Sequence, residues 1–197
     1  MKHNSAGYGF GGIALRLNDQ MIISYAGTKG PIDVAEDLTM LLTSCTQNDN
    51  AEKFLKDVLK KNPDVKQVYI SGHSLGGHLT QYAANSLYNS SDKDKLTKAL
   101  TFNAAPFTNP KHIIGESGPA LMKGSGLTID YNHSDWEIYD DKNLDNIIYN
   151  YAIKNDFLNY LLGGRYLGAD VEVFDQGYEP SEMFKAHKLN NFYKRIK

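Results

Sequence analysis

The chain of 197 residues contains a single cysteine, Cys45. One cysteine cannot form an internal disulfide, and it excludes zinc sites that need several thiolate ligands. This cysteine usage fits a reducing compartment, and it fits equally a protein exported without a classical signal or a piece cut from a longer chain. The sequence therefore predicts a fold with neither a disulfide nor a thiolate zinc site.

An excess of positive charge and long apolar runs are also missing. The chain has 21 Lys and Arg against 23 Asp and Glu, and its isoelectric point is near 6.3. Without a basic stripe to neutralise phosphates, nucleic acid is not an expected partner. No apolar run reaches the roughly 18 to 20 residues that span a bilayer, and the N-terminal stretch lacks the apolar core of a secretory signal. We therefore expect a soluble protein, either cytoplasmic or secreted without a classical signal peptide.

What the chain does contain is enough apolar residues, 41% of the total, for one compact domain over residues 1–197. "GGIALRL" and "QMIISYAGT" are separated by the polar turn "NDQ", which predicts a hairpin. Apolar residues then recur three and four apart over Ile32–Leu42 and Ala51–Lys60, which predicts two helices.

The rest of the chain alternates strand-like and helical patterns. The strand "VKQVYIS" precedes a glycine-rich turn and an amphipathic helix, and "KALTFNAAPF" predicts the next strand. Residues 107–126 read as an irregular excursion, followed by the strand-like segments "GLTIDYNHSDW", "NIIYNYAIKN" and "DVEVFD" and by the closing helix "AHKLNNFYKRI". This alternation predicts an α/β fold with a mostly parallel central sheet covered by helices on both faces.

The stretch "GHSLG" at residues 72–76 matches the G-x-S-x-G nucleophile elbow, in which a serine occupies a tight turn between a strand and a helix. Glycine suits the flanking positions because the strand and the helix approach too closely there for a Cβ atom. The alternative is a surface turn with a spectator serine, but the strand before it and the helix after it favour the elbow. Ser74 is therefore the predicted nucleophile, with His73 as a supporting neighbour.

A serine nucleophile needs a histidine to take its proton and a carboxylate to orient that histidine. Among the six histidines, only His187 lies late in the chain, as the order Ser, Asp, His requires. Asp156 directly follows a strand-like segment, so it would lie at the carboxyl end of a buried strand, where catalytic groups collect in open α/β sheets. Alternative acids are Asp170, Asp175 and Asp130.

From about Gly9 to Phe192, the chain resembles the class 3 lipase family of the α/β-hydrolase superfamily, in particular its compact bacterial members. The resemblance rests on four segments in the same order: "MIISYAGTKGPIDVAEDL", "QVYISGHSLGGHLTQYAA", "LTFNAAPF", and "YAIKNDFLNYL" with "AHKLNNF".

This resemblance implies an α/β-hydrolase fold with Ser74 as nucleophile, Asp156 as acid and His187 as base. It also implies an oxyanion hole formed by the backbone N–H of Leu75 and by Thr28.

Two departures from the family concern the region around that oxyanion hole. Many members carry an arginine where this chain has Ala26, and a tryptophan soon after the Gly-Thr pair where this chain has none. The helical lid of the fungal lipases is not expected here, because few residues separate Thr28 from the following acidic helix. The segment "KHIIGESGPALMKGSG" is the alternative cover for the site.

The function implied is hydrolysis of a lipid ester, by a phospholipase A1 or a glyceride lipase, without any cofactor. Residues expected to contact the acyl group are Phe107, Ile113, Phe157 and Leu158. Expected partners are the lipid or ester substrate, a membrane surface in transient contact and, for a secreted antibacterial effector, an immunity or carrier protein. The alternatives are a catalytically inactive binding module and a cytoplasmic esterase or thioesterase.

We interpret the acidic run Asp130–Asp141 as a solvated loop and not as a metal site.

Overall fold

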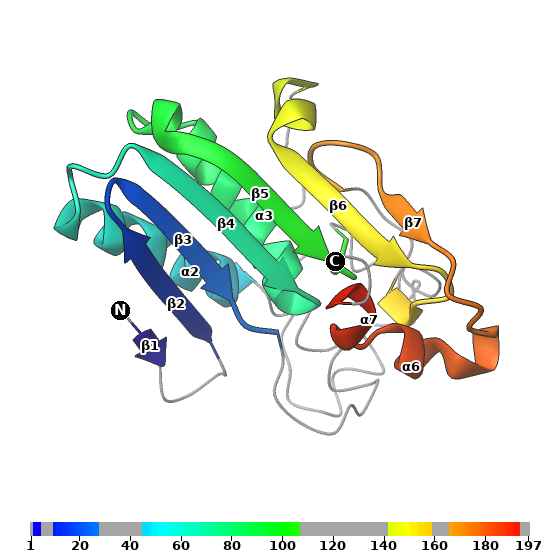
Figure 1. The fold of residues 1–197 in the computed structure, drawn as a ribbon. Helices are drawn as coiled ribbons and strands as arrows, with labels where there is room; N and C mark the ends of the chain where they lie inside the picture. Colours follow the sequence, from blue (N-terminus) through cyan, green and yellow to red (C-terminus); the bar gives the residue numbers. More distant parts are fainter. Residues whose placement is uncertain (1, 5–9, 28–44, 107–141, 159–165, 194–197) are drawn as a thin grey trace, which may run out of the picture.

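The computed structural model describes residues 2–4, 10–27, 45–106, 142–158 and 166–193. Its strands form one sheet in which spatial order follows chain order (Figure 1): β1 (Lys2–Asn4), β2 (Gly11–Leu17), β3 (Gln20–Tyr25), β4 (Gln67–His73), β5 (Leu96–Phe102), β6 (Ile148–Ile153) and β7 (Glu172–Phe174). The β1–β2 and β2–β3 pairs are antiparallel, and all pairs from β3 to β7 are parallel. The sheet is therefore mixed and mostly parallel, as predicted, and β1 is an addition that no sequence pattern indicated.

The β2–β3 hairpin confirms the turn expected at "NDQ". Leu17 pairs with Gln20, so the connection consists of Asn18 and Asp19. Asn18 has a φ of 56°, a left-handed conformation that asparagine tolerates better than most residues and that two-residue hairpins favour.

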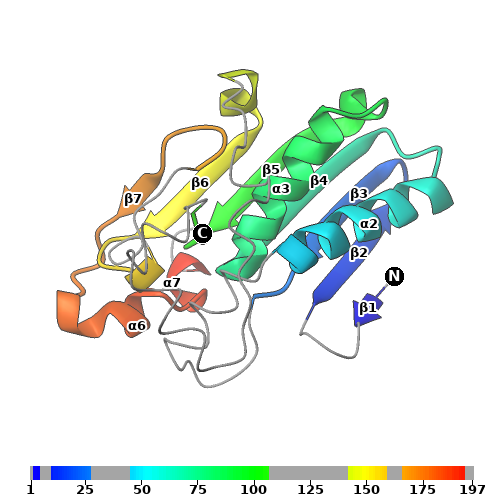
Figure 2. The ribbon, with the colours of Figure 1, turned by 180° about the vertical axis from the view of Figure 1, so that it is seen from behind.

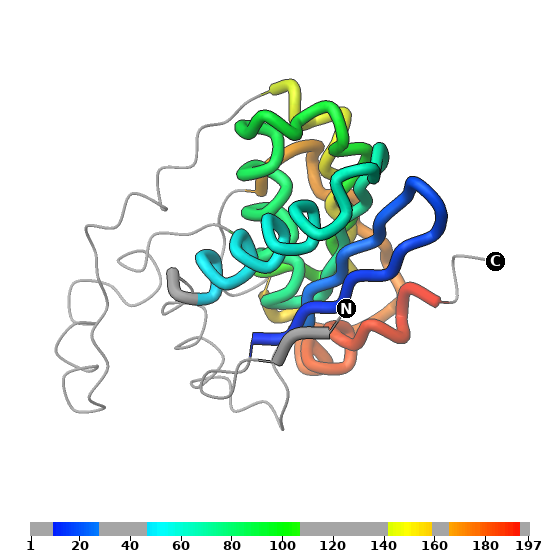
Figure 3. Tube along the Cα trace, turned by 90° about the vertical axis from the view of Figure 1, so that its left-hand side faces the viewer, coloured from blue at the N-terminus to red at the C-terminus, as the bar shows by residue number. Residues whose placement is uncertain are grey.

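Helices α2 (Cys45–Lys61) and α3 (Leu75–Tyr88) lie side by side on one face of the sheet (Figures 2 and 3). Alternate residues of the strands point toward them, as the buried Val68 and Ile70 of β4 illustrate. Together with apolar residues of α2 and α3, these side chains make the main core of the protein. Apolar side chains that recur every second residue in the strands thus pack against apolar side chains that recur about every 3.6 residues in the helices, and together they form one layer.

The opposite face of the sheet is covered unevenly by the described residues. At its carboxyl end, Phe192 of α7 (Asn190–Tyr193) packs against Phe102. Toward the hairpin, Leu15 and Ile22 pair with each other and remain about half exposed, at 56% and 49%. The expectation of helices on both faces therefore holds at the carboxyl end, where α6 (Met183–Ala186) and α7 lie (Figure 1).

Some predicted elements have different bounds. α2 begins at Cys45, before the predicted Ala51. The closing helix, predicted from Ala186, begins at Asn190 as α7, and the short helix α6, which was not predicted, ends at Ala186. His187 lies between the two helices. The predicted helix Ile32–Leu42, the excursion over residues 107–126 and the strand "GLTIDYNHSDW" lie outside the described residues.

In the part of the chain that the structure describes, no helix is both long and apolar enough to cross a bilayer.

Candidate active site

The polar residues singled out in the sequence meet at one edge of the sheet. Ser74 directly follows β4, Asp156 follows β6, and His187 lies between α6 and α7, beyond β7. Because β3 to β7 are parallel, their carboxyl ends lie at the same edge, next to α6 and α7 (Figure 1). Ligands of open α/β sheets bind at such an edge.

The turn at Ser74 has the strained backbone of a nucleophile elbow. Ser74 has φ 59° and ψ −128° between β4 and the first residue of α3. A Cβ atom on Gly72 would collide with the backbone of Gly76, and one on Gly76 would collide with the backbone of Tyr25. Non-glycine residues in such conformations persist only when the surrounding structure holds them there, and they cluster at functional sites. Gly72 and Gly76 were predicted to let the strand and the helix approach closely, and the structure shows that this contact leaves no room for a side chain at either position.

The three side chains expected to act together are in hydrogen-bond contact. The Ser74 hydroxyl oxygen lies 2.9 Å from His187 Nε2, and His187 Nδ1 lies 2.5 Å from Asp156 Oδ2. Asp156 is 0% exposed and His187 is 5% exposed. Since the Asp156 carboxylate can only accept, it requires the proton on Nδ1 and leaves Nε2 free to accept the serine proton.

The alternative acids do not occupy this position. Asp170 is exposed, and Asp175 is exposed and forms an ion pair with Lys154. Asp130 lies outside the described residues. Asp156 also accepts a hydrogen bond from the backbone N–H of Leu158 through Oδ1, at 3.1 Å, which orients its second oxygen toward His187.

His73, the neighbour of the serine, contacts the backbone of the base. Its Nε2 lies 2.7 Å from the carbonyl oxygen of His187, and the two imidazole rings are 4.7 Å apart at their centroids. Burial, together with the nearby His187, lowers the pKa of His73 to about 4. At neutral pH His73 is therefore uncharged and donates its Nε2–H to that carbonyl, which agrees with the predicted supporting role.

Two of the expected acyl-contacting residues lie beside the base. Phe157 and Leu158 are 2% and 1% exposed. The Phe157 ring lies 4.5 Å from the His187 ring and 5.3 Å from the ring of Phe184 on α6. The observed contacts of Phe157 are thus packing contacts that support the base, and substrate binding by these residues stays a prediction. Phe107 and Ile113 lie outside the described residues.

Sequence reasoning missed Phe184, which is 40% exposed and is connected to His187 through Phe157. Its signal in the sequence was its position three residues before the predicted base, just outside the predicted closing helix.

The structure describes one of the two residues expected to form the oxyanion hole, Leu75. Leu75 is the first residue of α3, so its N–H is among those that have no acceptor within their own helix. Thr28 lies outside the described residues. Its neighbour Gly27 lies against the elbow, since a Cβ atom there would be 3.2 Å from Ser74 Cβ and 2.9 Å from the His73 carbonyl oxygen. The segment after β3 therefore reaches Ser74, as the prediction requires.

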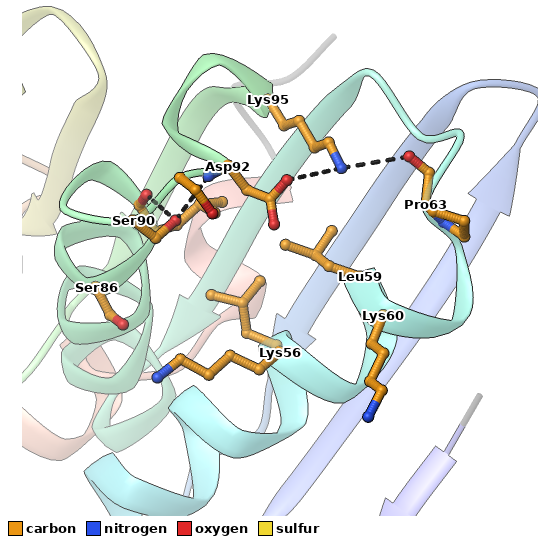
Figure 4. A pocket seen from close by; sticks show the side chains of 11 residues that line it. Lys56, Leu59, Lys60, Pro63, Ser86, Ser90, Asp92 and Lys95 are labelled. Atoms are coloured by element: carbon orange, nitrogen blue, oxygen red, sulfur yellow. Dashed lines mark hydrogen bonds and ion pairs between the residues drawn. The ribbon is translucent and has the colours of Figure 1, made fainter.

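A hollow of about 560 Å³ lies elsewhere, between the C-terminal halves of α2 and α3 (Figure 4). Its wall includes Pro63 and Lys95, which precede β4 and β5, so it lies at the amino ends of the strands, opposite the Ser74 edge. Several of its polar groups bond one another: Lys95 contacts Asp92 and the Pro63 carbonyl oxygen, and the Ser90 hydroxyl donates to the Leu87 carbonyl oxygen. This hollow is separate from the candidate active site.

Over the described ranges, no group of three or more His, Cys, Asp or Glu side chains is arranged to hold a metal ion. The acidic run Asp130–Asp141 lies outside those ranges.

Comparison with known proteins identifies a family. No curated protein and no solved structure matches the chain. A family model described as Mbeg1-like matches residues 4–118, a range that includes β2 to β5 and the elbow and ends before Asp156. Since this match covers more than half of the chain, the protein belongs to the Mbeg1-like family.

Proposed function

We propose that this protein is a serine esterase of the α/β-hydrolase fold that hydrolyses carboxylic esters of lipids through an acyl-enzyme intermediate. The observation that carries the proposal is the position of His187, whose two ring nitrogens contact Ser74 and Asp156 on opposite sides. The order Ser, Asp, His along the chain, with the serine on a strained turn between a strand and a helix, is the order of α/β-hydrolases. Family membership by itself does not supply this activity.

The chemistry follows from the geometry of these three residues. Ser74 Oγ attacks the ester carbonyl carbon while His187 Nε2 takes the hydroxyl proton, and Asp156 stabilises the resulting imidazolium. The tetrahedral intermediate collapses, the alcohol leaves with the proton from His187, and the acyl group remains on Ser74. Water then attacks the acyl-enzyme with His187 as base, releasing the carboxylic acid and restoring the serine hydroxyl.

An oxyanion hole formed by the Leu75 N–H and by Thr28 belongs to this proposal. The Leu75 N–H is at the N-terminus of α3, where the helix dipole favours negative charge. Removal of one such donor typically raises the barrier by about 2.7 to 4 kcal/mol.

An apolar acyl group is supported by the aromatic side chains beside the base. Phe184 is 40% exposed and packs on the buried Phe157, which packs on His187, so a row of aromatic rings connects the base to an exposed apolar side chain. Neutral glycerides and the sn-1 ester of phospholipids both present such a chain. The proposal extends to transient contact with a lipid surface and, if the protein is exported as an antibacterial effector, to an immunity or carrier protein.

The first experiment uses p-nitrophenyl esters of graded chain length, phospholipids labelled at sn-1 or sn-2, and a fluorophosphonate probe for serine hydrolases. We expect Ser74→Ala to abolish probe labelling and to lower turnover by about 10⁴-fold or more. Ser71→Ala changes a half-buried serine on β4, the strand that precedes Ser74; it is the matched control and should retain activity. Turnover that survives Ser74→Ala would contradict the proposal, and a folded wild-type protein without probe labelling would favour the inactive binding module.

The acid is tested in the same assay. Asp156→Asn should lower kcat by about 10³- to 10⁴-fold, because an amide does not hold His187 in the required tautomer. Asp170→Asn, on an exposed carboxylate, should leave kcat unchanged, and a large loss there would show that the acid is assigned wrongly.

A further inference from the structure

Asn103 lies at the point where the segments carrying the three catalytic side chains meet. It directly follows β5 and is 0% exposed. Its side-chain Oδ1 accepts a hydrogen bond from the backbone N–H of Ile153 at 2.7 Å, and its Nδ2 donates to the carbonyl oxygen of Ala186 at 3.0 Å. Ile153 ends the strand that precedes the acid, and Ala186 directly precedes the base.

Each residue bonded by the Asn103 side chain is close in sequence to a catalytic residue: Ile153 precedes Asp156 by three positions, and Ala186 directly precedes His187. The N–H of Asp156 donates to the carbonyl oxygen of Ile153 at 3.0 Å, so the same residue that donates to Asn103 accepts from the acid. The residue before Asn103, Phe102, accepts the backbone N–H of Ser74 at 3.1 Å. Main-chain or side-chain bonds thus connect residues 102 and 103 to all three segments of the site.

The orientation of the Asn103 amide follows from its partners. A backbone N–H can only donate and a carbonyl oxygen can only accept, so Oδ1 must face Ile153 and Nδ2 must face Ala186. A carboxylate of the same shape would meet the first requirement and fail the second.

The backbone of Asn103 explains why asparagine suits this position. Its φ is 41°, in the left-handed region that glycine enters freely and asparagine tolerates. Glycine would fit the backbone but has no side chain to bridge the two segments. Among L-residues, asparagine supplies both the conformation and a donor and acceptor on one short side chain.

We propose that Asn103 is a positioning residue of this hydrolase: its amide bridges the end of β6 to the segment before His187 and thereby sets the distance between acid and base. This proposal deepens the proposed function and rests on it. The Ala186 carbonyl oxygen also accepts from Asn191 Nδ2 at 3.0 Å, so loss of the Asn103 donor leaves that oxygen bonded. What is lost is the hydrogen-bonded connection of the Ala186 segment, through the Asn103 side chain, to the ends of β5 and β6.

The test compares Asn103→Asp and Asn103→Gly with two matched controls. Asn150→Asp changes another buried amide, whose side chain bonds Thr101, Leu167 and Ala169 and neither Ile153 nor Ala186. Asn18→Gly changes another asparagine with positive φ, at the far hairpin. Thermal unfolding gives the stability of each variant, and kcat is calculated per folded molecule, whereas KM needs no such correction.

Both Asn103 variants should lower kcat by about 10- to 100-fold, with a smaller change in KM, because a small misplacement of reacting groups has effects of this size. Asn150→Asp should lose stability with kcat near the wild-type value, and Asn18→Gly should change neither. Relative to wild type, Asn103→Asp should be most active at low pH, where the introduced carboxyl is protonated and can donate to Ala186. Equal kcat for Asn103→Asp and Asn150→Asp, or a pH-independent ratio to wild type, would overturn the proposal.

A readout without turnover separates this proposal from the proposed function. The His187 Nδ1 proton, bonded to Asp156, should give a downfield ¹H signal, assigned through its loss in His187→Gln. The Asn103→Gly substitution should weaken or shift this signal, while Asn18→Gly leaves it unchanged. If wild type shows no Ser74-dependent turnover but the signal responds to Asn103, the positioning role stands and the esterase function fails. An unchanged signal in Asn103→Gly overturns the positioning role whatever the activity.

Discussion

His73 and Ser74 are neighbours in the chain, and both bond the same residue through different atoms. Ser74 contacts the His187 ring, and His73 contacts the His187 carbonyl oxygen. Two contacts from adjacent residues restrict both the position of the base and the rotation of its ring toward the nucleophile. The His187 ring is also contacted by the ring of Phe157.

The effect of a substitution at His73 on turnover should therefore depend on whether the new side chain can still donate a hydrogen bond to the His187 carbonyl oxygen. His73→Gln keeps an N–H donor near the His187 carbonyl, whereas His73→Phe keeps a ring and loses the donor. We expect His73→Phe to lower kcat by about tenfold, the effect of one lost hydrogen bond, and His73→Gln to lower it less. The measurement is kcat and KM on a short-chain p-nitrophenyl ester. Equal activity of the two variants would show that the bond to the carbonyl does not matter.

At the scale of elements, the turn between β4 and α3 depends on close contact between backbones. The approach of α3 to β3 and β4 leaves no room for side chains at Gly72 and Gly76. Backbone atoms on both sides cannot move without displacing a strand, so relaxation around an added methyl group is costly.

Gly76→Ala should for this reason lower the free energy of unfolding by about 3 kcal/mol. Gly177→Ala is the control: an added Cβ there meets no atom within 4 Å, and φ is 76°, so only the backbone strain of about 1 kcal/mol applies. Urea denaturation of both variants at neutral pH gives the comparison. Similar losses for the two would mean that steric contact at the elbow is not the cause.

Local patterns predicted the central elements well and the C-terminal ones less well. β2, β3, β4 and α3 follow from alternation, turn residues and helical periodicity that each segment carries by itself. The closing helix was predicted from Ala186 onward because Leu189, Phe192, Tyr193 and Ile196 have helical spacing. In the structure α7 begins only at Asn190, and His187, before it, contacts a serine more than a hundred positions away. Local spacing does not record such a contact.

At the scale of the whole molecule, two histidines are held in the uncharged form at neutral pH: the buried His78 and the partly buried His73. Burial is the main cause that lowers the pKa of both His73 and His78 to about 4. In the unfolded chain the pKa of histidine is near 6.5. Below about pH 6.5 the unfolded state therefore binds more protons than the folded state, and stability falls as pH falls toward 4.

The stability supplied by these histidines should be complete above about pH 6.5 and decrease below it, by about 2 kcal/mol per histidine at pH 5. Urea unfolding at neutral pH and at pH 5 measures this loss. His78→Gln removes one of the two titrating groups, so its stability should fall less over the same interval. A variant with the same pH dependence as wild type would contradict the assignment of acid sensitivity to His78.

The sequence by itself determined the elbow, the candidate nucleophile Ser74, the candidate base His187 and the mostly parallel α/β sheet, because these depend on local spacing and on chain order. It favoured Asp156 as the acid without excluding other aspartates, and it offered no reason to single out Asn103. Only the tertiary structure decided that Asp156 contacts His187 and that Asn103 bridges the segments before them. The reason is physical: a hydrogen bond between distant segments depends on where the strands end in space. The local pattern of apolar and polar residues within a segment does not contain that information.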